Sequence, residues 1–167
     1  MPLAVRLQIR KLWAMDNLHI FLGATVADAA ARPLHWVYDP KKLNQFIKGK
    51  KEIAFLNQNK SPFYSIKTGN VSGYNDVGQV MFKTLISTQK KSEILRNFKK
   101  NIIKNFGPGS AYWRNLKLRK KYKKIKWKKP MKGPWIHQNI LENIQNIKAK
   151  KSISGGTKVN ESDGYCA

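Results

Sequence analysis

Cysteine is almost absent from the 167 residues, and so are long apolar runs. The single cysteine, Cys166, excludes an internal disulfide framework and favours a reducing compartment. No segment approaches the ~20 consecutive apolar residues with which a helix spans a bilayer. These absences predict a cytoplasmic chain with no transmembrane segment. The basic, partly apolar start can be interpreted as a targeting helix or, more simply, as an ordinary first helix.

Acidic residues are also scarce: 9 Asp and Glu against 33 Lys and Arg give a net charge of +24. Such a charge predicts attraction to polyanions, above all nucleic acid or an anionic membrane. However, the cations are mostly lysine, whereas arginine is favoured in phosphate and base recognition. The abundance of Lys together with Asn and Ile is also typical of an AT-rich coding sequence. Part of the charge can therefore be compositional.

The densest basic run covers residues 114–133, where Tyr122, Ile125 and Trp127 lie among many lysines. Basic residues with interleaved aromatic rings can hold single-stranded nucleic acid by charge and stacking. The alternative is a solvated insertion between two helices, which is how most charge runs are used. Nucleic-acid binding is therefore the secondary interpretation.

The period-two alternation of β-strands is sustained nowhere, whereas apolar residues recur at helical spacing. We expect helices over residues 3–31, 41–48, 76–89, 93–106 and 134–149, with Pro33 ending or kinking the first and Ser92 capping the fourth. The predicted apolar faces of the last four are Leu43, Phe46 and Ile47; Val77, Val80, Met81 and Leu85; Ile94, Leu95, Phe98, Ile102 and Phe106; and Ile136, Ile140, Ile144 and Ile147.

This pattern predicts an all-α fold with residues 1–167 as a single domain, into which the basic segment 114–133 is inserted. The polar, glycine-containing end suggests a truncated domain that stops before a further helix. Amphipathic helices without a full set of partners favour self-association through their exposed apolar faces.

Polar side chains stand at three places in this apolar framework. Asp28 lies in the alanine-rich segment GATVADAAARPLHWVYD, where a carboxylate must either tether a neighbouring loop or contact a ligand. His35 follows Pro33 as either a satisfied turn histidine or a polar group facing a cleft. In VSGYNDVGQV, Asn75 and Asp76 can cap a helix or offer oxygens to a hard cation such as Mg²⁺. The terminal SGGTKVNESDGYCA is either a surface loop or a loop that contacts substrate.

Together these segments resemble the ADP-ribosylglycohydrolase family, in particular its branch of J-crystallins and selenoprotein J. The resemblance rests on the order and spacing of GATVADAAARPLHWVYD, SGYNDVGQ, FGPGSAYW and KVNESDGYCA. It covers about residues 18–167 and corresponds to the N-terminal half of the family's all-α domain. It implies a two-Mg²⁺ site that binds ADP-ribose or an ADP-ribosylated protein and hydrolyses the glycosidic bond.

The resemblance also assigns roles residue by residue. Asp28 matches the family's first Asp-containing helix segment, near the substrate. His35 falls where active hydrolases carry a catalytic Glu, and Asn75 and Asp76 fall on the Thr-Asp-Asp-Thr metal motif. Ser162, Asp163 and Gly164 fall on a Ser-Asn-Gly loop that contacts substrate; these three and Asp28 are the candidate substrate-binding residues.

The departures from the family pattern change the expected function. Val77 cannot ligate a cation, Gly78 lacks a hydroxyl, and His35 replaces a carboxylate. Because ligand number and charge set the affinity of a metal site, Mg²⁺ is not expected to bind tightly. We therefore expect a catalytically silent or incomplete relative. The alternatives are a structural, crystallin-like protein and a polyanion-binding protein.

Overall fold

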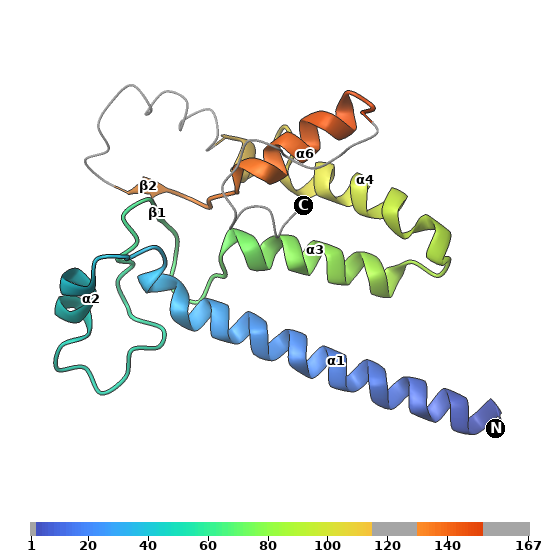
Figure 1. Cartoon of the computed structure of the whole chain (residues 1–167), viewed down its shortest axis with the longest axis horizontal. Coiled ribbons are helices and arrows are strands. Elements are labelled where there is room, and N and C mark those ends of the chain that lie inside the picture. The colour runs from blue at the N-terminus through green and yellow to red at the C-terminus, as the bar shows by residue number, and fades with distance from the viewer. Residues whose placement is uncertain (1–2, 115–129, 152–167) are drawn as a thin grey trace.

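The structure, a computed structural model, describes residues 3–114 and 130–151, and within them it is mostly helical (Figure 1). This confirms the predicted all-α class. The basic segment from 115 to 129 and the candidate residues Ser162, Asp163 and Gly164 lie outside the described residues. The elements are α1 (Leu3–Ala31), η1 (Arg32–Leu34), α2 (Pro40–Ile47), β1 (Tyr64–Ser65), α3 (Gly73–Ser87), η2 (Lys91–Glu93), α4 (Ile94–Phe106), β2 (Met131–Lys132) and α6 (Gln138–Lys148).

The first helix ends where the sequence predicts. α1 stops at Ala31, and Pro33 lies in the 3-10 turn η1 that follows. A proline has no N–H to donate and its ring clashes with the preceding turn, so the α-helix cannot continue through it. Within the described residues, no helix is both long enough and apolar enough to cross a membrane.

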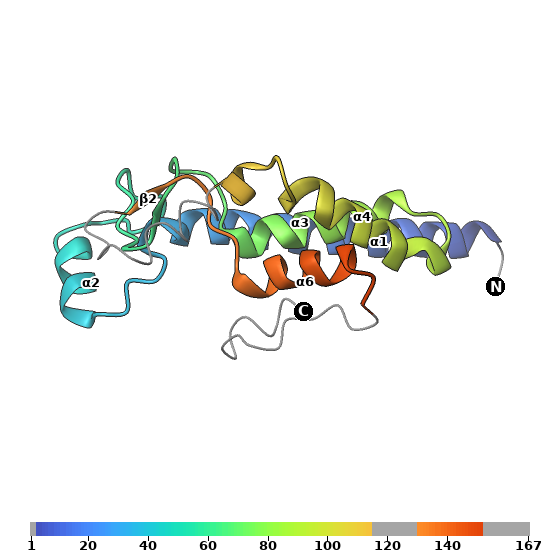
Figure 2. The same ribbon diagram turned by 90° about the horizontal axis from the view of Figure 1, so that it is seen from above.

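α3, α4 and α6 form the core, with α4 packed between the other two. Figures 1 and 2 both show α3 and α4 side by side, with α6 across α4. The buried cluster comprises Val77, Val80, Ile102, Phe106, Ile136, Ile140, Leu141 and Ile144. α1 lies against the outer side of α3, where the rings of Phe21 and Phe82 stack with their centroids 4.3 Å apart.

Some predicted apolar positions are not in this core. Met81 and Leu85 are exposed, whereas Val80 and Thr84, the residues directly before them, are buried. Successive helical side chains point about 100° apart, so each pair divides between the core and the surface. Leu95 is also 62% exposed. The expected cap at Ser92 is wrong as well: that residue lies in η2, and no side chain caps α4.

α2 begins as the sequence indicates, since the Asp39 carboxylate accepts hydrogen bonds from the backbone N–H groups of Lys41 (2.9 Å) and Lys42 (3.3 Å). Its apolar side chains Leu43, Phe46 and Ile47 face the protein but are only half-buried. α2 therefore covers a hollow at the end of α1 and is not part of the core.

A two-stranded parallel pairing was not predicted. Tyr64 lies opposite Met131 and Ser65 opposite Lys132, with the N–H of Gly133 donating to the Ser65 carbonyl at 2.8 Å. Strands of two residues have no alternation that a sequence pattern can reveal. Their pairing brings the segment before α6 beside the loop that follows α2.

We predict that Gly73→Ala destabilises the fold by about 1–3 kcal/mol, the range for overpacking a tight contact. A Cβ at Gly73 would overlap the backbone carbonyl oxygen of Trp135, so the segment before α6 would have to move. Gly23→Ala is the matched control, because a Cβ there meets nothing within 4 Å and alanine favours the helix. Urea unfolding should show a loss for the first variant and a small gain for the second. Equal effects would contradict this contact.

Candidate functional site

Arg32, directly after α1, is 1% exposed and is the largest fully buried side chain of the described residues. Its guanidinium donates to the carbonyl oxygens of Asn70 (2.8 Å), Ile66 (3.2 Å) and Lys67 (3.1 Å) and to Oδ1 of Asn59 (2.6 Å). Burial lowers its pKa, while the nearby Tyr64 and Asp28 raise it. A guanidinium stays charged in proteins, so these acceptors fix the segment from Asn59 to Asn70 around a buried cation.

Asp28 lies one turn earlier on α1 and holds the start of α3. Its Oδ2 accepts from the backbone N–H of Ser72 at 2.6 Å, and its Oδ1 accepts from the Ser72 hydroxyl at 2.7 Å. The same hydroxyl accepts from the N–H of Asn75 at 3.5 Å and caps α3. Asp28 thus tethers the loop that precedes α3, which is one of the two roles that the sequence predicts for it. Its role in binding substrate stays a prediction.

Asn75 and Asp76 lie inside the first turn of α3, because Ser72 occupies the cap position. The expectation that their side chains cap this helix is therefore wrong. Asn75 Nδ2 donates to Thr25 Oγ1 at 3.4 Å, and Asn75 Oδ1 accepts from Gln79 Nε2 at 3.0 Å. Both ends of this amide are engaged by protein groups.

Asp76 accepts a hydrogen bond from the Tyr112 hydroxyl and is largely buried. Burial and the negative charge of Asp28 raise the pKa of Asp76 to about 7, although the Lys83 ammonium acts in the opposite direction. A substantial fraction of Asp76 is therefore protonated and neutral at neutral pH. A cation binding here would therefore have to compete with a proton, because hard cations bind ionised carboxylates.

His35 is held in an aromatic cluster. Its Nδ1 lies 2.8 Å from the Tyr64 hydroxyl, and its ring lies against those of Trp36 and Tyr74 at 4.6 and 5.8 Å between centroids. Burial lowers the pKa of His35 to about 4, assisted by the positive charges of His137 and Arg32 and opposed by Asp28. His35 is therefore neutral near pH 7.

The cluster continues through Trp36, which follows His35 in the same turn, and through four rings that sequence reasoning missed. Trp36 makes edge-to-face contacts with Phe63, Tyr64, Trp135 and His137, with centroids 5.4–5.7 Å apart. The backbone φ of Trp36 is 64°, a left-handed conformation that a bulky residue rarely adopts. Because these rings come from segments far apart in the sequence, the spacing of residues carries no signal for them.

The donor chemistry of these residues is a poor fit for Mg²⁺. Asp28 already accepts hydrogen bonds on both oxygens, and Asp76 accepts one from Tyr112. Across residues 3–114 and 130–151, no group of three or more His, Cys, Asp and Glu side chains could hold a metal ion. The weak affinity for Mg²⁺ that the sequence suggests stays a prediction.

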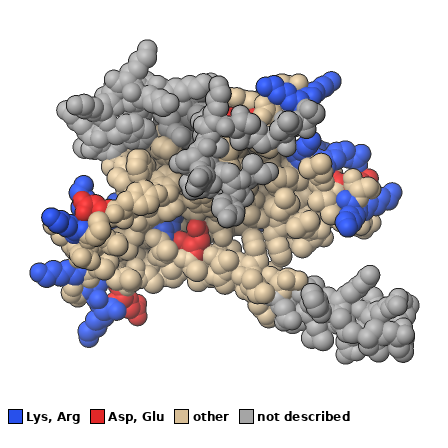
Figure 3. Space-filling model, in the orientation of Figure 1, with Lys and Arg blue, Asp and Glu red and all other residues tan. Residues whose placement is uncertain are grey.

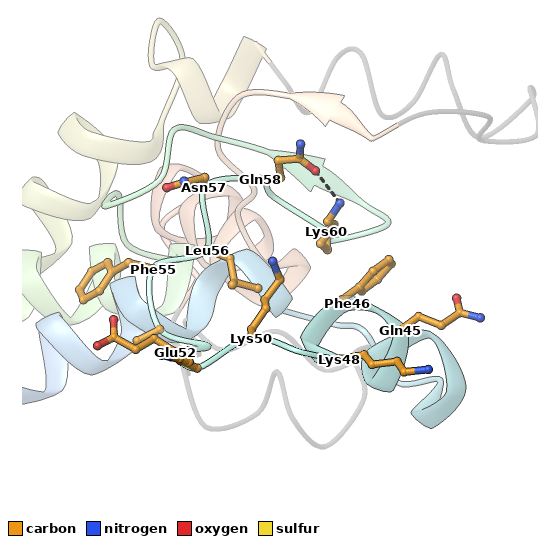
Figure 4. A pocket seen from close by; sticks show the side chains of 12 residues that line it. Gln45, Phe46, Lys48, Lys50, Glu52, Phe55, Leu56, Asn57, Gln58 and Lys60 are labelled. Carbon is orange, nitrogen blue, oxygen red and sulfur yellow. Dashed lines mark hydrogen bonds between the residues drawn. The ribbon is translucent and has the colours of Figure 1, made fainter.

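Two hollows flank α2. An apolar one of about 700 Å³ lies between α1 and α2 and includes His35 and Trp36 in its lining. A second, of about 880 Å³, lies beside α2 and the loop after it and is shown in Figure 4. Lys48, Lys50, Lys51 and Lys60 line this basic hollow.

Aromatic rings accompany the lysines of the basic hollow. The Lys60 ammonium lies 5.2 Å from the centroid of the Phe46 ring and donates to Gln58 Oε1 at 2.6 Å. Phe55 lies at the opposite side of the view from Phe46 in Figure 4. On the face shown in Figure 3, most Lys and Arg side chains lie toward two ends of the described body, and the mostly uncharged middle contains a small acidic patch with basic atoms beside it.

The geometry defines a helical protein whose central polar residues are engaged mainly with one another. Two known proteins are similar to this chain: crystallin J1B and crystallin J1A of Tripedalia cystophora, 31% and 30% identical over 144 residues. These matches cover 86% of this chain but 41% of each crystallin, so the chain spans about two fifths of their length. The chain is thus homologous to J-crystallins. No protein-family model matches it, and no solved structure matches it.

We predict that Asp76→Asn gains stability relative to the native chain as the pH rises from about 4 to about 7. The ordinary pKa of aspartate is 3.8, whereas the pKa of Asp76 in the folded chain is about 7. Between these values the folded state retains a proton that the unfolded state loses, so the native chain loses stability with rising pH and the asparagine variant does not. Urea unfolding at about pH 4.5, 6 and 7.5 measures the difference.

His35→Gln provides a control of opposite sign. The pKa of His35 is lowered from 6.5 to about 4, so its contribution to native stability rises with pH between these values. The glutamine variant should therefore lose stability relative to the native chain over that range. Parallel pH profiles for the native chain and Asp76→Asn would show that the Asp76 carboxyl titrates normally.

Proposed function

We propose that this chain is a non-catalytic, J-crystallin-related protein with an ADP-ribosylglycohydrolase-like arrangement of its first helices. The observation that supports this proposal most directly is the state of Asp76, the carboxylate that the resemblance places on the metal motif. It accepts a hydrogen bond from Tyr112 and has a pKa of about 7. A cation at Asp76 would have to displace both this proton and the Tyr112 hydroxyl.

The other candidate residues support the same proposal. Hydrolysis of an ADP-ribose glycosidic bond by this family requires metal-bound oxygens and a carboxylate that assists the attack of water. Asp28 is engaged by Ser72, and His35 offers a neutral imidazole where the family carries a Glu. Residues 162–164 remain candidates for contacting ADP-ribose on resemblance alone.

A structural role, as in a crystallin, is the companion proposal, with the cytoplasm as its location. Several large apolar side chains are exposed, among them Ile20 at 71%, Ile86 at 69% and Leu95 at 62%. Exposed apolar surface of this kind favours association with further polypeptide. Self-association through these helix faces is therefore part of the proposal.

Polyanion binding is a second candidate, and the basic hollow beside α2 favours it. Four lysines, with Phe46 and Phe55, line this hollow. Lysine charges attract phosphates, and aromatic rings can stack on bases.

Isothermal titration of ADP-ribose into the purified chain, with and without Mg²⁺ and at two salt concentrations, tests the proposal. We expect no saturable Mg²⁺-dependent binding and no release of ADP-ribose from an ADP-ribosylated protein. One-to-one binding that requires Mg²⁺ would contradict the proposed loss of the metal site. A single-stranded oligonucleotide titrated in parallel tests the second candidate, which predicts affinity that falls steeply with salt.

A further inference from the structure

The apolar hollow between α1 and α2 has the size and lining of a small-molecule site. Its volume of about 700 Å³ lies within the range of roughly 300–1,000 Å³ typical of ligand pockets. One wall consists of small residues of α1, and the opposite wall consists of branched side chains of α2 and of the loop after it. These wall residues are Ala27, Ala30, Ala31, Leu43, Ile47 and Ile53.

Backbone hydrogen bonds fix the walls in place. The N–H of Phe55 donates to the Ala30 carbonyl at 2.9 Å, and the N–H of Lys60 donates to the Pro33 carbonyl at 2.7 Å. These bonds attach the loop after α2 to the last turn of α1, at Ala30, and to η1, at Pro33. Ala27 and Ala31 are exposed, and their small side chains leave the space between the helices open.

The charged residues at one end of the hollow are already compensated. Asp28 accepts two hydrogen bonds from Ser72, and Arg32 donates to four acceptors of the following loop. The two residues also carry opposite charges and lie close enough for Asp28 to raise the pKa of Arg32, so an ionic ligand would meet no net charge here, in contrast to the lysines of the basic hollow on the other side of α2. The hollow suits a neutral molecule.

Beside Asp28 and Arg32, the imidazole of His35 also lines the hollow between α1 and α2. The Tyr64 hydroxyl keeps its proton, because burial raises the pKa of Tyr64 to about 12, and the neighbouring Arg32 guanidinium is a donor only. We therefore assign Tyr64 as the donor to His35 Nδ1, which leaves the proton of the neutral ring on Nε2. Every buried side-chain nitrogen or oxygen of the described residues has a hydrogen-bond partner. Nε2 of His35 has no partner within residues 3–114 and 130–151, so it is not fully buried there and is accessible as a donor.

Trp36 adds a rigid aromatic surface beside His35. Four surrounding rings hold the indole, and its left-handed backbone costs about 1–3 kcal/mol, a kind of strain that clusters at ligand-binding sites. Both residues line the hollow next to the flat alanine surface of α1. The lining therefore favours a planar molecule over a branched one.

We propose that the hollow between α1 and α2 binds a small, neutral, planar aromatic molecule, with one acceptor atom directed at the His35 imidazole. This inference is independent of the proposed loss of ADP-ribose chemistry, since it uses neither a metal nor the lysines. A polypeptide helix fits less well, because Trp36 and the loop at Ile53 bound the space.

The neutral fluorophore prodan, a planar naphthalene with a carbonyl acceptor, is the probe for this proposal. We expect saturable binding to the full chain, with emission shifted away from its position in water. The double variant Ala27→Leu/Ala31→Leu fills the hollow from exposed helical positions, where leucine is almost as good a helix former as alanine, and it should weaken binding by about tenfold or more. His35→Phe keeps a ring and removes the donor, so a loss of about fivefold is expected from one net hydrogen bond.

Ala24→Leu is the matched control, because Ala24 is exposed on the same helix and does not line the hollow. Its affinity for prodan should equal that of the native chain. Equal affinity of Ala24→Leu and the double variant would overturn the proposal, since prodan would then be held by other exposed apolar surface. Circular dichroism of each variant verifies that the helices remain formed.

Discussion

A buried cation at the end of α1 organises much of the described structure. Removing a guanidinium from water is costly unless its donors find acceptors, and those of Arg32 find three backbone carbonyls and one side-chain amide. All four acceptors come from the loop between residues 59 and 70, which has little regular structure of its own. The Arg32 guanidinium therefore supplies hydrogen bonds that regular secondary structure would otherwise make in this loop, and the position of the loop depends on them.

The rest of the central polar network follows from this placement. With the loop fixed, Ser72 reaches Asp28 and caps α3, and Tyr64 reaches His35. Asp28 and Asp76 come close enough for the charge of one to raise the pKa of the other. Asp28, His35 and Asp76, which resemble parts of a hydrolase site, thus form hydrogen bonds that connect segments of this chain. The homology to J-crystallins and this use of polar side chains support the same non-catalytic proposal.

Local signals in the sequence were sufficient for most helices. Pro33 ended α1, the Asp39-Pro40 pair started α2, and the glycine at 107 ended α4. Ser72 could also have been identified as a cap, because serine is favoured directly before a helix. Apolar faces were less predictable: Leu95 and Leu85 satisfy the helical period, but which side of a helix meets a neighbour depends on tertiary packing.

The site was less predictable than the helices because its contacts join distant segments. The four acceptors of Arg32 lie 27 to 38 residues away, and Asp28 and Ser72 are separated by 44 residues. The sequence supported a tether for Asp28 but could not identify its partner. Arg32, Tyr64 and Trp135 were not singled out at all, since an arginine or an aromatic ring has no local pattern that distinguishes a buried role.

The stability of Arg32→Lys tests the central claim most directly, with the exposed Arg96→Lys as its control. Lysine keeps the positive charge, but its compact ammonium has three donors and lacks the planar fork that reaches acceptors on both sides. We predict that Arg32→Lys lowers the free energy of unfolding by at least about 2 kcal/mol, as expected for losing charged hydrogen bonds in a buried site. Arg96→Lys, in a surface ion pair with Glu93, should change it by less than about 1 kcal/mol. Equal, small effects of the two substitutions would contradict the account, because the loop would then be held without the buried cation.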